Sequence, residues 1–192
     1  GLESLVLGEP QILGQIGTAY QTAQAGGKSG PQLTLLFRIG IEAGKRARSE
    51  TAISTNPASI SSVAIALAQA VTGDLADRRV LVVGLGEMGR LTVKTLRGRN
   101  VGQIDLANRT VVKAAAAAAM WGGASYSLDQ LDQAIAQADV VFTAATSPTP
   151  LIDRALIGRT RRTRNDRPLV LVDLAVPRNV NSDVASLPGV HL

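Results

Sequence analysis

The stretch that most constrains how this chain can fold is residues 80–89, which read V-L-V-V-G-L-G-E-M-G. Four apolar, mostly β-branched residues are typical of a buried strand, and residues 87–96 behind them have the spacing of a helix. In the G-x-G-x-x-G turn between them, Gly84 permits the tight turn, Gly86 lets a pyrophosphate approach the backbone, and Gly89 allows close packing of helix and strand. Because free backbone N–H groups and the positive end of the helix dipole then face the phosphates, the motif predicts a dinucleotide site.

The end of the next predicted strand, residues 103–107, indicates which dinucleotide is bound. A unit that binds NAD usually carries an acidic residue about 20 residues after the glycines, where it holds the ribose 2′-hydroxyl. Here the strand ends without a carboxylate. A carboxylate would repel a 2′-phosphate, whereas Arg109 can bind one through two parallel hydrogen bonds, so we predict NADP(H), although Arg109 could also be a solvated surface residue. The predicted cofactor-binding residues are Gly84, Leu85, Gly86, Glu87, Met88, Gly89, Asn108, Arg109 and Thr110.

The chain after residue 76 alternates between predicted strands and helices. Apolar runs rich in β-branched residues indicate buried strands, and the alanine run at residues 114–119 indicates a helix packed closely on a sheet. This alternation predicts an α/β fold with a doubly wound parallel sheet of the Rossmann type. Strands are expected at residues 80–83, 103–107, 124–126, 139–144, 169–174 and from 191, with helices at 87–96, 111–121 and 128–138.

Three helices are predicted before the sheet. The first begins at Pro10 and ends at Gly26-Gly27, the second covers residues 33–47, and the third covers residues 59–71. The helical spacing of the second predicts that its buried side carries Leu33, Leu36, Phe37, Gly40 and Ile41.

Composition excludes several classes of site. The chain has no cysteine and one histidine, so it offers no disulfide, no thiol nucleophile and no Cys- or His-rich metal site. No apolar run approaches the roughly 20 residues of a membrane span, and no signal peptide is recognisable. We therefore expect a cytoplasmic protein, or one of an equivalent reducing compartment, without metal. We also expect a fragment, because the chain starts without Met and stops inside a predicted strand.

Five arginines are concentrated in residues 159–167, which are predicted to form a loop. Clustered arginines can bind phosphate or RNA. Because no aromatic residues for base stacking are interleaved with them, a solvated run of charges is favoured.

The first 15 residues, GLESLVLGEPQILGQ, resemble a segment that characterises the glutamyl-tRNA reductase family. Three further stretches are similar to that family: the V-G-L-G-E-M-G form of the glycine turn, N-R-T at residues 108–110, and D-L-A-V-P-R at residues 173–178. The resemblance covers essentially the whole chain.

The resemblance implies an enzyme that uses NADPH to reduce the glutamyl ester of tRNA(Glu) to glutamate-1-semialdehyde, the first step of tetrapyrrole (haem and chlorophyll) synthesis. A cysteine thiolate attacks the ester and gives a thioester that accepts hydride. In the family this cysteine lies in a T-C-N-R segment, with an important histidine, before the position of Gly1 here. No catalytic residue is therefore expected in this chain, which should be inactive alone, and the full-length protein should be a homodimer.

By the same resemblance, polar residues of the first stretch line the glutamate pocket, namely Ser4, Glu9, Pro10, Gln11 and Gln15. A hydroxyl, a carboxylate and two carboxamides can bind an ammonium and a carboxylate together, although Glu9 could simply be an anion at the start of a helix. The resemblance also implies three parts: the end of a catalytic domain (residues 1–56), a linking helix (57–76) and an NADPH-binding domain that is incomplete at its C-terminus (77–192).

Two other functions remain open from the sequence. One is an NADP oxidoreductase similar to shikimate or quinate dehydrogenase, which would need a catalytic Lys–Asp pair in a preceding domain. The other is a non-catalytic module that binds NADP as a sensor or structural ligand. A T-C-N-R segment upstream would support the reductase, and its absence would support the sensor.

Overall fold

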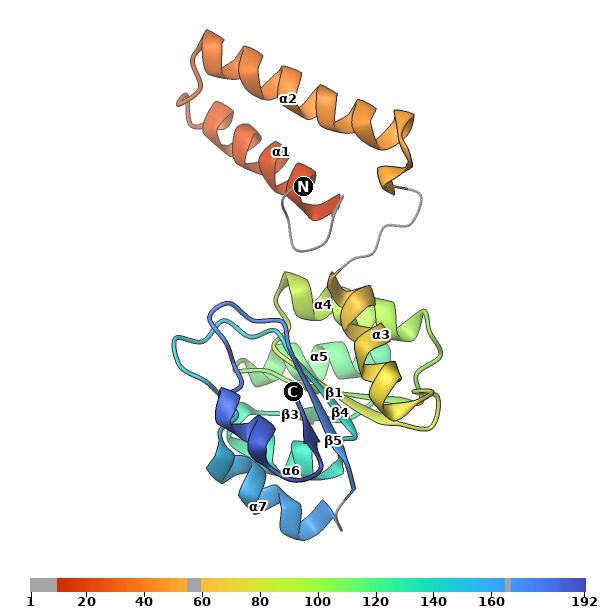
Figure 1. Ribbon diagram of the computed structural model, residues 1–192. Helices are drawn as coiled ribbons and strands as arrows, with labels where there is room; N and C mark the ends of the chain where they lie inside the picture. Colours follow the sequence, from red (N-terminus) through yellow and green to blue (C-terminus); the bar gives the residue numbers. More distant parts are fainter. Residues whose placement is uncertain (1–9, 55–59, 165–166) are drawn as a thin grey trace. The chain divides into compact units, whose positions relative to one another are not determined.

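A computed structural model describes residues 10–54, 60–164 and 167–192. The chain divides into two compact units, with the division between Val63 and Ala64. We describe each unit by itself (Figure 1).

The described part of the first unit is a pair of helices, α1 (Pro10–Ala25) and α2 (Pro31–Glu50), followed by the short 3-10 helix η1 (Ala52–Ser54) and the first turn of α3 (Ile60–Thr72). The two long helices lie side by side (Figure 1). They approach closely where Gly44 meets Leu13, since a Cβ on Gly44 would lie 2.7 Å from Leu13 Cδ1. Tyr20 stacks on Phe37 with 5.6 Å between the ring centroids.

The predicted buried side of α2 is partly wrong. Phe37 and Ile41 are half-buried, but Leu33 and Leu36 are exposed, and α2 has no fully buried residue. The residues nearest α1 follow a spacing of three and four, which continues to Gly44. Because α2 carries leucine and isoleucine over much of its circumference, periodicity alone could not select this stripe.

The second unit is built on a six-stranded parallel sheet with the order β3-β2-β1-β4-β5-β6. This order reverses between β1 and β4, which is the arrangement of a doubly wound dinucleotide-binding fold. The predicted fold class is therefore confirmed. The strands are β1 (Arg79–Val83), β2 (Gln103–Ala107), β3 (Ser125–Tyr126), β4 (Val140–Thr143), β5 (Leu169–Asp173) and β6 (Val190–His191).

Helices cover both faces of the sheet (Figure 1). Val80 and Val82 of β1 contribute to one core, under α3 (Ile60–Thr72), α4 (Glu87–Arg97) and α5 (Val111–Trp121). Leu81 and Val83 point the other way, into a second core under α6 (Leu131–Gln137), α7 (Arg154–Arg164) and the 3-10 helix η3 (Ser182–Ser186). Strands buried on both faces need apolar residues at every position, which explains the unbroken apolar run of β1.

Three helices can be compared with the elements predicted from the sequence. In α5 the inward residues are Ala114, Ala117, Ala118 and Trp121, so the alanine run does pack on the sheet, although its other members are exposed. The predicted helix at residues 128–138 begins as a 3-10 turn, η2 (Leu128–Gln130), before α6. α3 crosses the division between the units, and its Ala64, Ile65 and Ala68 lie in the core of the sheet unit.

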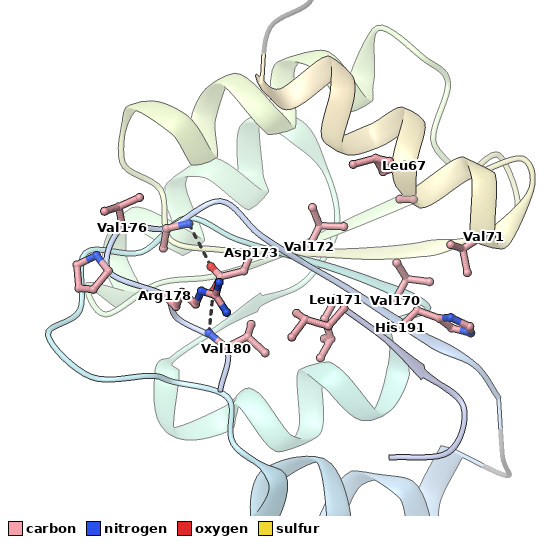
Figure 2. A pocket seen from close by; sticks show the side chains of 14 residues that line it. Leu67, Val71, Val170, Leu171, Val172, Asp173, Val176, Arg178, Val180 and His191 are labelled. Carbon is pink, nitrogen blue, oxygen red and sulfur yellow. Dashed lines mark hydrogen bonds between the residues drawn. The ribbon is translucent and has the colours of Figure 1, made fainter. Parts of the chain in front are cut away.

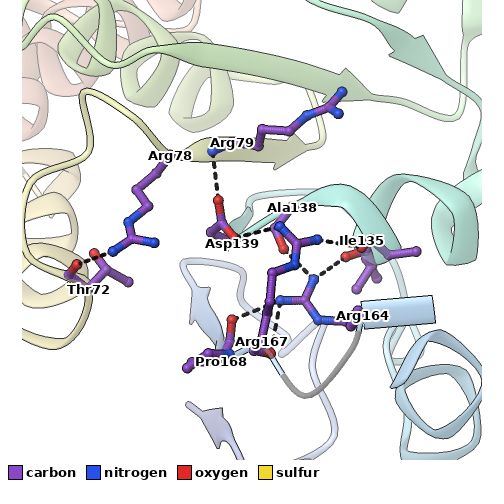
Figure 3. Close-up of polar contacts among 10 residues, drawn as sticks. Thr72, Arg78, Arg79, Ile135, Ala138, Asp139, Arg164, Arg167 and Pro168 are labelled. Atoms are coloured by element: carbon purple, nitrogen blue, oxygen red, sulfur yellow. Dashed lines mark hydrogen bonds and ion pairs between the residues drawn. The ribbon is translucent and has the colours of Figure 1, made fainter. Parts of the chain in front are cut away.

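The prediction of a loop at residues 159–167 is wrong, because α7 continues to Arg164. Arg164 is buried, and its guanidinium donates to the carbonyl oxygens of Ile135 (2.6 Å), Ala138 and Pro168 (2.8 Å) (Figure 3). Burial lowers the pKa of the Arg164 guanidinium, and the nearby positive charge of Arg167 adds to this.

Arg167 pairs with Asp139 at 3.2 Å, and Asp139 also accepts the Arg79 backbone N–H (Figure 3). Arg164 and Arg167 therefore join the ends of α6 and α7 to the start of β5. Arg159 and Arg167 are exposed, as the sequence favoured, whereas Arg164 is not part of a solvated run of charges. The sequence pattern missed this because Arg164 continues the buried stripe of Leu156, Ile157 and Thr160, where an apolar residue is usual.

None of the helices in the described ranges combines the length and the hydrophobicity needed to cross a bilayer.

Candidate dinucleotide site

The glycine turn joins β1 to α4, and its three glycines have different surroundings. Gly84 has a φ of +94°, and a Cβ there would lie 2.6 Å from Ala145 Cα. A Cβ on Gly89 would overlap the carbonyl group of Gly84, so this position fixes the approach of α4 to the turn rather than to the strand itself. Gly86, at the N-cap of α4, has nothing within 4 Å of its missing Cβ. Two glycines are thus required by the fold, whereas the third leaves open space in front of the helix.

Asn108 connects this turn to the end of β2. Its Oδ1 accepts the Leu85 backbone N–H at 3.2 Å, and its Nδ2 donates to the Thr110 carbonyl at 3.1 Å. Both ends of the carboxamide are therefore engaged with the backbone. The side chain of Asn108 therefore links the glycine turn to the loop that follows β2.

A cleft of about 470 Å³ opens beside the turn, within the range of small-molecule sites. Arg109, Thr110 and Lys113 lie at its β2 end, and all three side chains are exposed. Among the residues that line it in the described chain, Arg109 and Lys113 are charged and none is acidic. The cleft is lined by Gly84, Leu85, Gly86, Asn108, Arg109, Thr110, Lys113, Leu128, Ala144, Ala145, Thr146, Ser147 and Leu151.

Six of the nine predicted cofactor residues therefore lie in one cleft. Glu87, Met88 and Gly89 form the first turn of α4 and are not among the residues that line it. They form the start of the helix, the end at which backbone N–H groups point out along the helix axis.

The sequence prediction missed Lys113. A signal for it existed, because Lys113 is in the first turn of α5 after the N-cap Thr110. A cation is unfavourable at the positive end of a helix dipole unless an anion lies nearby.

The acidic residue closest to this end of β2 in sequence, Asp105, has a structural role. It is buried within the strand, two residues before the strand ends. Its carboxylate accepts hydrogen bonds from Arg79 (3.2 Å), Gln103 (3.0 Å) and the Ala124 backbone N–H (2.8 Å). It therefore does not supply the acidic group that an NAD site places at the strand end.

A larger groove of about 800 Å³ lies between α3 and the β5–β6 side of the sheet (Figure 2). Its walls are mostly aliphatic, with Leu67 and Val71 of α3 facing Val170 and Val172 of β5. Size alone would select this groove, but binding sites also need convergent polar groups, and these are found at the glycine turn.

The predicted glutamate pocket is described only in part. Ser4 and Glu9 lie outside the described residues, and Pro10 begins α1. Gln11 is half-buried, and its Oε1 is enclosed without a hydrogen-bond partner among the described residues, whereas Gln15 is exposed.

Two family models match the chain, one in each part. Residues 1–51 match "Glutamyl-tRNAGlu reductase, N-terminal domain", and residues 66–192 match "Shikimate / quinate 5-dehydrogenase". Over all 192 residues the chain is 41% identical to a glutamyl-tRNA reductase from Methylococcus capsulatus, of which it covers 46%. It is 43% identical over its full length to one from Stenotrophomonas maltophilia, of which it covers 45%.

A solved structure agrees with these relatives. Glutamyl-tRNA reductase from Methanopyrus kandleri matches 100% of this chain and 48% of its own, with 40% identity and a TM-score of 0.66. The chain belongs to the glutamyl-tRNA reductase family. It spans less than half the length of these reductase relatives. Residues 66–192 also belong to the domain family described as shikimate / quinate 5-dehydrogenase. This match explains why the sequence left open an oxidoreductase similar to those dehydrogenases.

Proposed function

We propose that this chain is the nucleotide-binding part, with the adjoining helices, of an enzyme that reduces glutamyl-tRNA(Glu) to glutamate-1-semialdehyde with NADPH. The observation that carries the proposal is full-length similarity to glutamyl-tRNA reductases, combined with a cleft whose charged side chains are both cationic. The reaction begins tetrapyrrole synthesis, in a cytoplasmic enzyme that is a homodimer at full length.

The residues of the cleft fit NADPH, which supplies hydride when bound. The open space at Gly86 admits a pyrophosphate, which a side chain would otherwise displace. Arg109 and Lys113 can neutralise the 2′-phosphate, and Arg109 can do so with two parallel hydrogen bonds. Asn108 holds the loop that carries these cations at a fixed distance from the glycine turn.

The thioester chemistry belongs to a cysteine elsewhere in the full-length enzyme, because this chain has none. We propose that Ser4, Glu9, Pro10, Gln11 and Gln15 line the glutamate pocket. The enclosed Oε1 of Gln11, which has no hydrogen-bond partner within the described part of the chain, supports this, since a buried acceptor without a partner is costly unless a ligand supplies the donor. We also propose three parts of the chain: the end of a catalytic domain (residues 1–56), a linking helix (57–76) and an NADPH-binding domain (77–192).

Titration of the 192-residue chain with NADPH and NADH tests the cofactor. Reduced nicotinamide fluoresces, so binding can be followed directly and by transfer from Trp121, the single tryptophan. We expect NADPH to bind at least about tenfold more tightly, the gain of one charge-assisted contact. Equal affinities would contradict the assignment to NADPH.

The match of residues 66–192 gives a second candidate, oxidation of shikimate or quinate with NADP. The reductase is favoured because residues 1–51 match the N-terminal domain of that enzyme. NADP reduction by the chain in the presence of shikimate or quinate would reverse this choice.

A further inference from the structure

The carboxylate of Asp173, at the end of β5, organises the loop that follows it. Its Oδ1 accepts the Thr143 hydroxyl (2.7 Å) and the Ala175 backbone N–H (3.1 Å). Its Oδ2 accepts the backbone N–H groups of Asn179 (2.8 Å) and Val180 (2.9 Å). Figure 2 shows this carboxylate inside the curve of the loop. Four donors occupy its lone pairs, so Asp173 fixes backbone geometry.

Asn179 connects the loop after β5 to a second loop, which lies between β4 and α7. Its side chain is fully buried, and its Oδ1 accepts the Ala145 backbone N–H at 2.9 Å. Its carbonyl oxygen accepts the N–H groups of Leu151 (2.7 Å) and Ile152 (3.0 Å). The beginning and the end of the β4–α7 loop are therefore both held by one residue of the β5 loop.

The segment held in this way is a wall of the dinucleotide cleft. Ala145 lies directly against Gly84, and the cleft is lined by residues 144–147 on this side. Hydrogen bonds and close packing thus form a continuous series from Asp173 through Asn179 and Ala145 to Gly84.

We propose that Asp173 and Asn179 are positioning residues for the nicotinamide half of the cofactor, acting through residues 144–147. The inference rests on the proposed function. With the 2′-phosphate at Arg109 and Lys113 and the pyrophosphate at Gly86, the rest of the dinucleotide crosses the point where the strand order reverses, from β1 to β4. Residues 144–147 are the cleft wall on that side.

The unpaired Nδ2 of Asn179 supports a role beyond stability. This amide nitrogen is buried and has no hydrogen-bond partner among the described residues. An unsatisfied buried donor destabilises a fold, so an asparagine is a poor choice at this position for packing alone. Its value lies in the acceptor that it presents to Ala145.

Comparison of two ligands tests the proposal. Adenosine 2′,5′-bisphosphate occupies only the Arg109 end of the cleft, whereas NADPH also reaches residues 144–147. In Asn179→Ala we expect NADPH affinity to fall about tenfold and bisphosphate affinity to stay within about twofold. Asn181→Ala, an exposed asparagine two residues on, is the matched control and should bind both ligands normally.

Thr143→Val provides a milder variant if Asn179→Ala does not fold. It removes one donor to Asp173 at nearly constant volume and should give the same selective loss of NADPH affinity, to a smaller extent. Equal losses for both ligands, or no loss in either variant, would overturn the positioning role. If the wild-type chain bound neither ligand, the proposed function itself would fail as well.

Discussion

At the scale of single residues, two cations, Arg109 and Lys113, lie at the cleft, and no ion pair with another described residue explains their position. Lys113 occupies the first turn of α5, where the helix dipole disfavours positive charge. A bound 2′-phosphate would reverse that penalty, because an anion is stabilised at a helix N-terminus and by both side chains.

Replacement of Arg109 by alanine should therefore lower affinity for NADPH about tenfold to a hundredfold, the usual cost of one charge-assisted hydrogen bond or two. Affinity for NADH, which lacks the 2′-phosphate, should change little. Lys113→Ala should act in the same direction. Arg97→Ala, an exposed arginine in the last turn of α4, is the control. If Arg109→Ala weakened both cofactors equally, Arg109 would not be the 2′-phosphate contact.

Gly86→Val should abolish cofactor binding while the protein stays folded. The φ of Gly86 is −68°, which valine can adopt, and its side chain would project into open space that the pyrophosphate needs. Circular dichroism and NADPH titration together check this. Gly158→Ala, also in open space but on α7, should bind normally. Normal NADPH binding by folded Gly86→Val would mean that the turn has only a structural role.

The residues that line the cleft could be predicted from the sequence where a motif reflects a physical requirement of the backbone or of a charged ligand, and not elsewhere. The glycine spacing located the turn and the N-R-T stretch located Arg109, because both follow strands with a clear apolar signature. Asn108 lines the cleft, but its hydrogen bond from the Leu85 N–H depends on the tertiary structure and is not revealed by any local pattern. The buried Asn179 is 95 residues beyond Gly84, and only the fold brings Ala145 between them.

At the scale of elements, the parallel strands were predicted well because burial on both faces leaves them as short apolar runs. α7 was missed because its sequence, RALIGRTRRTR, is dominated by arginine. The helix is stabilised by the buried guanidinium of Arg164, which replaces water as the donor to carbonyl groups at the end of α6 and the start of β5. Only the tertiary structure supplies these acceptors.

Arg164→Met should consequently destabilise the sheet unit by about 3 kcal/mol or more, because methionine fills similar space but leaves several buried carbonyl groups without a donor. Urea unfolding followed by circular dichroism measures the change. Arg159→Met, exposed on the same helix, should change stability by less than about 0.5 kcal/mol. Similar stabilities of the two variants would show that the Arg164 hydrogen bonds add nothing that water cannot supply.

At the scale of the whole molecule, the two units differ in how well they enclose a core. The sheet unit has two buried clusters, one on each face. In the first unit α2 has no fully buried residue, and leucines 33, 35 and 36 are exposed. A sequence pattern cannot choose the buried side of a helix whose apolar residues surround it. The family comparison matches residues 1–51 to the N-terminal domain of a reductase, which shows which domain these helices belong to.

The chain as it stands should therefore bind cofactor without turning over substrate. Reduction through a thioester needs a thiolate, and the sequence holds no cysteine. The single histidine of the sequence, His191, lies in β6 and is not among the residues that line the dinucleotide cleft, so it activates no nucleophile there. We expect no NADPH oxidation on charged tRNA(Glu).

Joining the chain to the N-terminal segment that carries the T-C-N-R cysteine in this family should restore NADPH oxidation and release of the semialdehyde. The same segment with serine in place of that cysteine should not, although it would bind NADPH equally well. Turnover by the 192-residue chain alone would contradict the thioester route, since hydride would then reach the ester without a sulfur intermediate. If both results are obtained, cofactor binding and turnover are separable in this protein, because the cleft that we propose for NADPH lies in a unit whose sequence holds no cysteine.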